Sequence, residues 1–314
     1  MKRILVVYYS QTGQLERIVR SVTAPFEHNA EVQVDTLQLR PAKAYPFPWP
    51  FVGFFDQFPE CVRLDPAPLA PFQLPQESIE QGYDLVILGY QPWYLSPSPP
   101  TTAFLQSPLA ARLLNNTPVV TVIGCRNMWI MGQERVREMV RAAGGKLVDN
   151  IALVDGGSPY ETFITTPVWL LTGRKHFLPG VFTAAGVAER DISGAAHFGQ
   201  QLLAGLLDGR LQRGESVLDA LQACPVNPSY VVSEKMGWRS FWIWSWIVRL
   251  AGKQGSPLRV PLLACYALFL GLAIALVVPL TLVARFVLGY VPAYRRWLAS
   301  QVAYYQREPA LVRQ

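Results

Sequence analysis

The chain has 314 residues, of which 51% are hydrophobic and 16% are charged, and its formal net charge is +6. This length is enough for one complete α/β domain with an additional segment. The residues from Lys235 onward include ten Lys or Arg and one acid, Glu308, whereas the preceding part has eighteen basic and twenty-one acidic residues. The net charge is therefore about −3 for the body and +9 for the tail. Because the basic tail is also apolar and rich in tryptophan, it favours membrane lipid as a partner and argues against nucleic acid.

The cysteines and histidines do not suggest a metal centre. The chain has four cysteines and three histidines, which are scattered without a Cys-x-x-Cys pair. We therefore predict neither a metal site nor a disulfide framework. The chain begins Met-Lys-Arg and continues directly into an apolar run, which is typical of a strand and not of a signal peptide. This pattern predicts that the body stays in a reducing cytosol.

Apolar, β-branched runs alternate along the body with segments whose apolar residues recur every three or four positions. This alternation is typical of parallel βαβ units with right-handed crossovers. It predicts an α/β fold, an open three-layer sandwich around a parallel sheet, with the ligand site beyond the carboxyl ends of the strands. The five predicted strands are residues 4–9, 31–37, 84–89, 118–124 and 146–154.

The loop after the first predicted strand is rich in hydroxyl groups. Ser10 and Thr12 lie in it, and apolar helical spacing begins at Leu15. Hydroxyls and free backbone N–H groups at a helix N-terminus bind phosphate. Gly13 is the only glycine of the loop, so the pattern is neither a dinucleotide fingerprint nor a Walker loop. The alternative is an ordinary strand-to-helix turn with capping hydroxyls.

Two further loops follow the predicted strands 84–89 and 118–124, and both should lie at the same edge of the sheet. The first contains Pro92, Trp93, Tyr94 and Leu95. The second is Gly124-Cys125-Arg126-Asn127. Other roles remain open: the aromatic residues as packing residues, Arg126 as a surface ion-pair residue, and Cys125 as a small buried residue.

Together these three loops resemble those of the flavodoxin-like FMN-binding family, which includes NAD(P)H:quinone reductases. The resemblance covers about residues 1–207 and implies a flavodoxin-like fold with FMN as cofactor. The first loop would hold the phosphate, the second would place an aromatic ring against the flavin, and the third would offer N–H groups to its pyrimidine edge. The implied FMN-binding residues are Ser10, Gln11, Thr12, Gly13, Gln14, Leu15, Pro92, Trp93, Tyr94, Leu95, Gly124, Cys125, Arg126 and Asn127.

More narrowly, the stretches 8–15 and 125–129 are similar to those of proteins named dialkylresorcinol-condensing enzymes. The chain also departs from the flavodoxin pattern. Leu15 stands where the family's phosphate loop has a second threonine, and the insertion 155–187 is long. These departures leave room for weak FMN binding or for another ligand.

The segment 41–75 contains nine prolines and eight aromatic residues. Proline at this density predicts the absence of regular helix and of inner strand. The aromatic content predicts that the segment lies against an apolar surface, since disordered segments are poor in such residues. We expect a long loop packed on its own domain. A lid over a lipid-like substrate, or a surface that dips into a membrane, is the alternative.

The tail contains residues 260–284, a run of 25 residues without a charge. As a helix at about 1.5 Å per residue, this run is long enough to cross a membrane. A single crossing is the first expectation, and a re-entrant or interfacial anchor remains open. For the preceding helix 235–256, packing on the flavodoxin-like body is the alternative. The predicted parts are a flavodoxin-like domain 1–210, a linker 211–234, an interfacial amphipathic helix 235–256, a transmembrane helix 257–289 and a basic tail 290–314.

These features predict a membrane-anchored, FMN-dependent oxidoreductase with NAD(P)H as electron donor. The substrate would be apolar, such as a quinone or an alkyl-resorcinol or polyene lipid precursor, and no catalytic acid or base is assigned. The body would be cytoplasmic, held at the inner membrane, with a homodimer or biosynthetic partner enzymes as further expectations. The alternatives are a non-redox condensing or cyclase-like component that has lost FMN, and a membrane-tethered electron-transfer flavodoxin.

Overall fold

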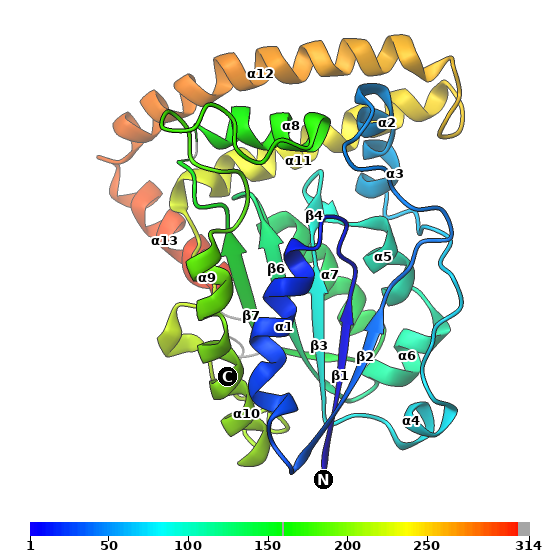
Figure 1. Cartoon of the computed structure of the whole chain (residues 1–314). Coiled ribbons are helices and arrows are strands. Elements are labelled where there is room, and N and C mark those ends of the chain that lie inside the picture. The colour runs from blue at the N-terminus through cyan, green and yellow to red at the C-terminus, as the bar shows by residue number, and fades with distance from the viewer. Residues whose placement is uncertain (159, 307–314) are drawn as a thin grey trace.

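In the computed structural model, which describes residues 1–158 and 160–306, five parallel strands form a sheet in the order β2-β1-β3-β6-β7 (Figure 1). In chain order this is 2-1-3-4-5, the doubly wound order of flavodoxin-like folds. The predicted α/β fold with a five-stranded parallel sheet is therefore confirmed. The strands are β1 (Lys2–Tyr8), β2 (Val32–Gln38), β3 (Leu85–Tyr90), β6 (Pro118–Cys125) and β7 (Lys146–Val154).

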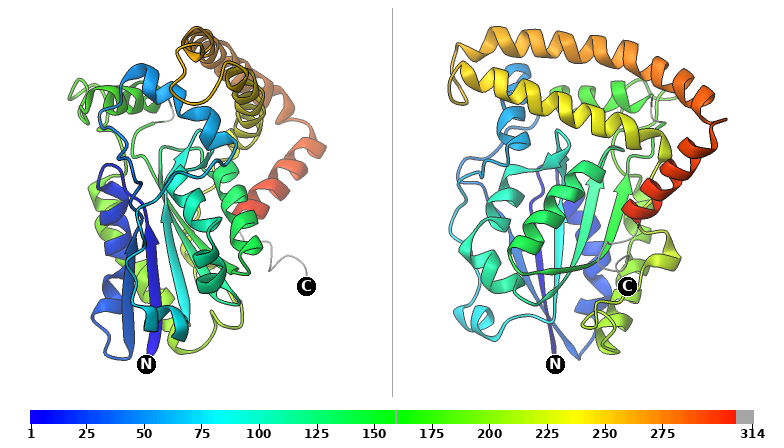
Figure 2. Two further views of the ribbon diagram at one scale, coloured as in Figure 1. Left: turned by 90° about the vertical axis from the view of Figure 1, so that its right-hand side faces the viewer. Right: turned by 180° about the vertical axis from the view of Figure 1, so that it is seen from behind.

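Helices cover both faces of this sheet (Figures 1 and 2). The alternation of side chains along β1 explains both cores, because Ile4 and Val6 belong to one buried cluster and Leu5 and Val7 to the other. The first face is covered by α1 (Gln14–Glu27), α9 (Glu189–Gly194) and α10 (Ala196–Leu207). The second face is covered by α5 (Pro99–Leu105), α6 (Pro108–Leu114) and α7 (Ile130–Ala142), with α4 (Gln76–Gln81) at the lower end.

The prediction that the proline-rich segment 41–75 has no regular helix is wrong. It contains α2 (Phe51–Asp56) and α3 (Phe58–Val62). Pro50 caps α2 and Pro59 lies in the first turn of α3, where a missing N–H costs nothing. The prediction that the segment lies against an apolar surface is confirmed, since Phe58 and Val62 are buried in a cluster with residues of the tail helices.

The tail forms helices α11 (Pro228–Leu250), α12 (Arg259–Leu288) and α13 (Pro292–Gln306). Helix α11 begins inside the predicted linker and ends before 256, and α13 occupies most of the predicted basic tail, of which residues 307–314 lie outside the described ones. Helices α11 and α12 run side by side across one end of the molecule, and α13 turns back toward the body (Figures 1 and 2). The insertion 155–187, apart from Pro159, which lies outside the described residues, contains the apolar helix α8 (Thr162–Thr172) at the same end. A short 3-10 helix, η1 (Asp219–Leu221), precedes α11.

Helices α1 and α10 approach each other closely at Gly199. A Cβ atom at this position would lie 1.9 Å from the carbonyl oxygen of Val22. Only glycine therefore allows this separation between the two helices.

We predict that Gly199→Ala lowers the free energy of unfolding by roughly 1–3 kcal/mol, because α1 and α10 must move apart to accommodate the methyl group. Chemical denaturation of the full chain measures the loss. Gly194→Ala is the matched control, since a Cβ there meets no atom within 4 Å. Equal stability of the two variants would contradict this account of the helix contact.

Candidate functional site

Three loops meet at the carboxyl end of the sheet. The strand register brings them level, because Tyr8 is paired with Gly89 and Tyr90 with Ile123. The loops are residues 9–13 after β1, the small hairpin of β4 (Pro92–Trp93) and β5 (Ser96–Pro97) after β3, and residues 126–129 after β6. The structure thus brings together the three loops that the sequence singles out.

The first loop forms an open turn with free backbone donors at the start of α1. Gly13 has φ +78° and precedes the helix, and a Cβ there would meet no atom within 4 Å. The Ser10 hydroxyl accepts a hydrogen bond from the Glu16 N–H at 3.3 Å. The backbone N–H groups of residues 11–15 donate no hydrogen bond to another described residue. Open space and free amides at a helix N-terminus suit an anion.

The departure at Leu15 has a packing explanation. Its side chain is 2% exposed and lies in the core cluster with Ile18 and Val22. A hydroxyl at this position would lie in an apolar core. The groups of the loop that remain accessible to an anion are its amides and the half-buried Thr12.

The two glutamines of the first loop bind neighbouring segments. Gln11 donates through Nε2 to the Pro46 carbonyl at 2.8 Å and accepts from the Trp49 indole at 3.4 Å. The Gln14 amide oxygen accepts from the Val187 N–H at 3.2 Å. Both side chains hold other parts of the chain around the loop, and neither is directed to a ligand in this arrangement.

The second loop sends its two aromatic residues in different directions. Trp93 lies in a cluster with Tyr9, Tyr45 and Trp49, with ring centroids 6.1, 5.1 and 5.6 Å away. We call these four residues the loop aromatic cluster. Tyr94 instead packs against Phe54, and its hydroxyl donates to the carbonyl of the same residue.

Backbone geometry explains this divergence. Tyr94 and Leu95 both have positive φ, +51° and +60°, as a two-residue hairpin turn requires. Such a turn directs Tyr94 toward the cluster formed by α3 and the tail helices, which also includes Phe58 and Phe241. Of the two predicted flavin-stacking residues, only Trp93 lies beside the first loop.

In the third loop, the guanidinium of Arg126 forms no ion pair within 4 Å among the described residues, although the carboxylates of Asp155 and Glu234 interact with it at longer range. Arg126 lies over the Phe163 ring at 4.2 Å and donates to the Thr162 carbonyl at 3.4 Å. Asn127 donates to the Thr162 hydroxyl at 3.3 Å, so both residues fasten the loop to the start of α8. The alternative of a surface ion pair for Arg126 is therefore not what the structure shows. Burial lowers the pKa of Arg126 and raises that of the Cys125 thiol, which favours a packing role for Cys125.

Sequence reasoning missed Glu234, which links the tail to the third loop. This side chain of α11 is 1% exposed and accepts a hydrogen bond from the Met131 N–H, at the start of α7, at 2.7 Å. Burial raises the pKa of its carboxyl to about 8. A signal was available, because Glu234 is the last acid before a long basic and apolar stretch, but its partner could not be read from the sequence.

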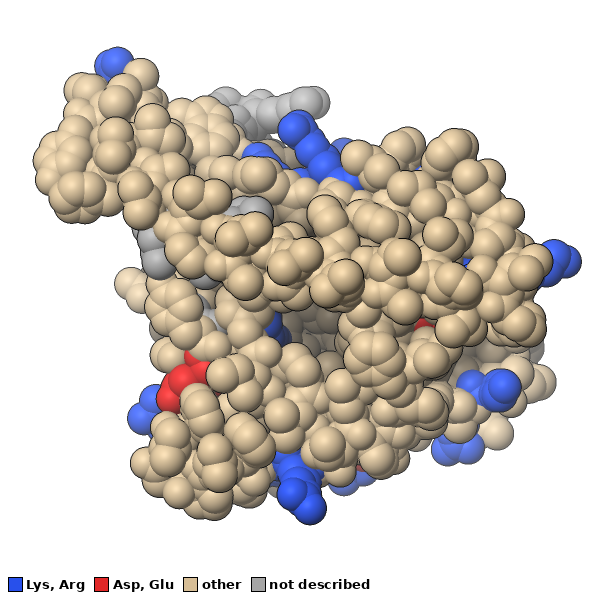
Figure 3. Space-filling view, turned by 90° about the horizontal axis from the view of Figure 1, so that it is seen from above, with Lys and Arg blue, Asp and Glu red and all other residues tan. Residues whose placement is uncertain are grey.

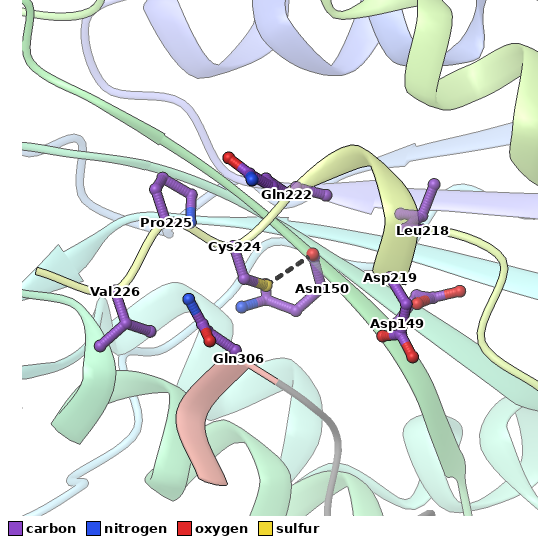
Figure 4. Close-up of a pocket in the computed structure, with 10 residues that line it drawn as sticks. Asp149, Asn150, Leu218, Asp219, Gln222, Cys224, Pro225, Val226 and Gln306 are labelled. Carbon is purple, nitrogen blue, oxygen red and sulfur yellow. Dashed lines mark hydrogen bonds between the residues drawn. The ribbon is translucent and has the colours of Figure 1, made fainter. Parts of the chain in front are cut away.

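A cavity of about 440 Å³ lies elsewhere, beside the edge strand β7 (Figure 4). Several of the groups around it have partners, although the buried Nδ2 of Asn150 has none among the described residues. Asp149 accepts from the Ser216 hydroxyl at 2.6 Å and from the Val217 N–H at 2.9 Å, and the Cys224 thiol donates to the Asn150 carbonyl at 2.8 Å. These bonds attach the connection before α11 to the sheet edge, so we assign the cavity a structural role.

Within residues 1–158 and 160–306, no three His, Cys, Asp or Glu side chains gather as a metal site would require. The four cysteines are free thiols.

The strand order and the layers define a flavodoxin-like fold. No known protein family matches the chain, and no curated protein matches it in sequence. Among solved structures it is similar to a flavoprotein in complex with FMN from Lactobacillus acidophilus, with a TM-score of 0.38, 12% identity, and coverage of 48% of this chain and 93% of that one. It is also similar to a flavodoxin, WrbA-like protein from Agrobacterium tumefaciens, with a TM-score of 0.38, 11% identity, and coverage of 66% and 99%. A third similar structure is oxidised flavodoxin 1 from Bacillus cereus, with a TM-score of 0.36, 12% identity, and coverage of 65% of this chain and 98% of that one. The class rests on the strand order and the layers, since similarity at this level carries no functional argument.

We predict that the Glu234 carboxyl makes the free energy of unfolding depend on pH. Its pKa is raised from an ordinary 4.5 to about 8, so the folded chain holds the proton more tightly than the unfolded chain. The stabilising contribution is fully present below 4.5 and is lost as the pH rises to about 8. Glu234→Gln, which stays neutral, should remove this contribution to the pH dependence, and denaturation midpoints at pH 5 and 8 measure it.

Glu138→Gln serves as the control, because Glu138 is an exposed residue of α7 paired with Arg135 at 2.8 Å. It should retain the wild-type pH dependence. If Glu234→Gln retained it as well, Glu234 would not be the buried titrating group that we describe.

Proposed function

We propose that the chain is an FMN-binding redox protein that acts on an apolar molecule at a membrane. The observation that carries this proposal is the open, amide-lined turn at Gly13, which lies in the same site as the loop aromatic cluster and Arg126. A protein that binds reduced FMN must accommodate its phosphate group, its ring system and the negative charge on the ring. The turn at Gly13, the loop aromatic cluster and Arg126 are the groups of this site that match them.

The residues present fit FMN. The free N–H groups of residues 11–15, the Thr12 hydroxyl and the positive end of the α1 dipole would hold the phosphate. Trp93 is half-buried in edge-on contact with the other rings of the loop aromatic cluster, and a flavin ring packed on this cluster would gain about 0.5–1.5 kcal/mol beyond area burial. Arg126 carries a positive charge with no ion pair within 4 Å among the described residues, although Asp155 and Glu234 interact with it at longer range, and this charge would stabilise a reduced flavin. Bound FMN would supply the hydride and electron chemistry.

The surroundings of the site favour an apolar substrate. The segment that contributes Tyr45 and Trp49 crosses to α8, where the Trp49 N–H donates to the Leu170 carbonyl at 2.8 Å. Helix α8 has no charged side chain over its 11 residues. The chain around the loops is therefore aromatic and aliphatic, which suits a quinone or an alkyl-resorcinol or polyene lipid precursor. We propose NAD(P)H as the electron donor.

One observation favours a second candidate. Gln11 and Gln14 are bound to neighbouring segments, and Leu15 belongs to the core, so the first loop has fewer side-chain groups for phosphate than its flavodoxin counterparts are expected to have. A non-redox component of lipid or pigment biosynthesis that has lost FMN would show these features. An electron-transfer flavodoxin would bind FMN but accept electrons only from another protein, whereas the proposed reductase would be bleached by NAD(P)H.

We predict that Thr12→Asp weakens FMN binding roughly a hundredfold, because two like charges about 5 Å apart at an effective dielectric constant of 20 repel by about 3 kcal/mol. Riboflavin, which lacks the phosphate, should bind both proteins with similar affinity. Flavin fluorescence quenching measures both affinities. Ser193→Asp places the same charge on an exposed residue of α9 and should leave both unchanged. If Thr12→Asp weakened the binding of FMN and of riboflavin equally, the assignment of the phosphate site to this loop would be contradicted.

A further inference from the structure

One end of the molecule carries an exposed apolar surface made by four helices. Helices α2, α8, α11 and α12 lie together at the end toward which the strands point (Figures 1 and 2). Large apolar side chains are exposed on all four: Phe51 on α2, Ile164 on α8, Trp242 and Trp246 on α11, and Leu268 and Leu272 on α12. We call this surface the apolar roof. It is too extensive for an ordinary soluble surface, where apolar side chains are scattered singly.

Basic side chains lie around the edge of the apolar roof. Figure 3, which looks onto this end, shows mainly uncharged atoms, with Lys and Arg around the edge and few acidic groups. Exposed basic residues on or beside the roof helices include Arg174, Arg239 and Lys253, whereas Arg249 is paired with Asp65 at 3.0 Å. An apolar surface with a basic edge is complementary to a bilayer that contains anionic lipid, and aromatic and arginine side chains favour the headgroup level.

Helix α12 has 30 residues, and an 18-residue stretch within it has a mean hydropathy of 2.6, so it is long and apolar enough to cross a membrane. Its first end, however, is fixed to the body. Arg259 is 0% exposed, and its guanidinium donates to both Glu60 carboxylate oxygens, at 3.1 and 3.3 Å. Leu263 and Tyr266 are buried beside Phe58 of α3. The start of α12 therefore lies on the body side.

After the other end of α12, the chain returns to the same body through α13. Helix α13 follows α12 after a short turn, and its Tyr305 is 6% exposed within the main core cluster. Gln301 accepts a hydrogen bond from the Lys235 ammonium of α11, and the Tyr304 hydroxyl accepts one from Arg137 of α7 at 3.4 Å. A helix that crosses a bilayer once has its ends on opposite sides. With both ends bound to one body, α12 cannot do this.

We propose that the apolar roof docks onto a bilayer containing anionic lipid, with α12 lying in the plane of the membrane interface and not crossing it. Figure 3 shows a hollow near the middle of this surface, and in Figure 1 the strands point toward the same end of the molecule. Docking in this way places the site against the lipid, so an apolar substrate reaches it from the bilayer. This last step rests on the proposed function, whereas the orientation of α12 does not.

Thiol labelling of the full chain in sealed membrane vesicles tests the orientation. In a Cys265→Ala background, single cysteines replace Ala30 on the body and Ser300 after α12, both exposed. We expect a membrane-impermeant maleimide to label the two alike before detergent is added. Labelling of Ser300→Cys only after detergent, when Ala30→Cys is labelled before it, would establish a crossing and overturn the proposal. The Cys265→Ala protein without an added cysteine measures the background labelling of Cys125, which is subtracted.

Flotation of the purified chain with vesicles tests the surface itself. With phosphatidylglycerol in the vesicles, the bound fraction should exceed that with phosphatidylcholine alone. Trp246→Glu should lower the partition coefficient roughly tenfold or more, because a large apolar side chain on the roof no longer leaves water. Leu207→Glu, an exposed apolar residue on α10 of the body, is the matched control. Equal binding by the two variants would overturn the proposal.

FMN absorbance is recorded in the same samples. If the chain docks without bound flavin, the proposed docking stands and the proposed FMN-dependent function is contradicted. If the chain binds flavin but does not dock, FMN binding stands and the proposed docking is contradicted.

Discussion

The placement of the tail depends on the interaction between the buried guanidinium of Arg259 and the carboxylates of Glu60 and Asp56. The guanidinium donates to Glu60, and its Nη1 lies 3.1 Å from Asp56 Oδ1, although without the geometry of a hydrogen bond. Asp56 in turn accepts from the Gly255 N–H at 2.7 Å. Burial raises the pKa of both carboxyls, against the effect of the cation. Removing one member of such a group costs about 3–5 kcal/mol, because the remaining charge stays buried.

This interaction joins two segments that are unusual in sequence. The proline-rich segment supplies the two carboxylates and Phe58, and the tail supplies Arg259 and Tyr266, whose ring stacks on Phe58 with centroids 4.1 Å apart. Through Tyr94, the second loop of the site belongs to the same cluster. Through Glu234, the tail also holds the start of α7 beside the third loop. The site and the tail are therefore parts of one packed unit at the end of the sheet.

The body could be predicted from the sequence because its signals are local. The β-branched run at Ile4 and the helical spacing after Leu15 each follow from a few neighbouring residues, and strand polarity then brings the three loops to one edge. The free amides at Gly13 follow from the same reasoning, since a helix N-terminus always has unpaired donors.

The remainder depends on contacts between distant residues. The turn at Tyr94 sends its ring to α3 and the tail, which no spacing in the loop indicates. Glu234 and Met131 are 103 residues apart, and no local pattern pairs them. The short helices at Pro50 and Pro59 form because each proline occupies a helix start, a position that density alone does not reveal. Hydropathy identified α12 as apolar, but the packing of α13 on the body, which follows it, was not predicted.

The most direct test of the central claim is the visible absorption spectrum of the full chain, purified in detergent and supplied with FMN before gel filtration. The account predicts that FMN stays with the protein at one molecule per chain and that its fluorescence is quenched by the aromatic residues around Trp93. A chain that emerges colourless, with all the flavin in the small-molecule fraction, would contradict it.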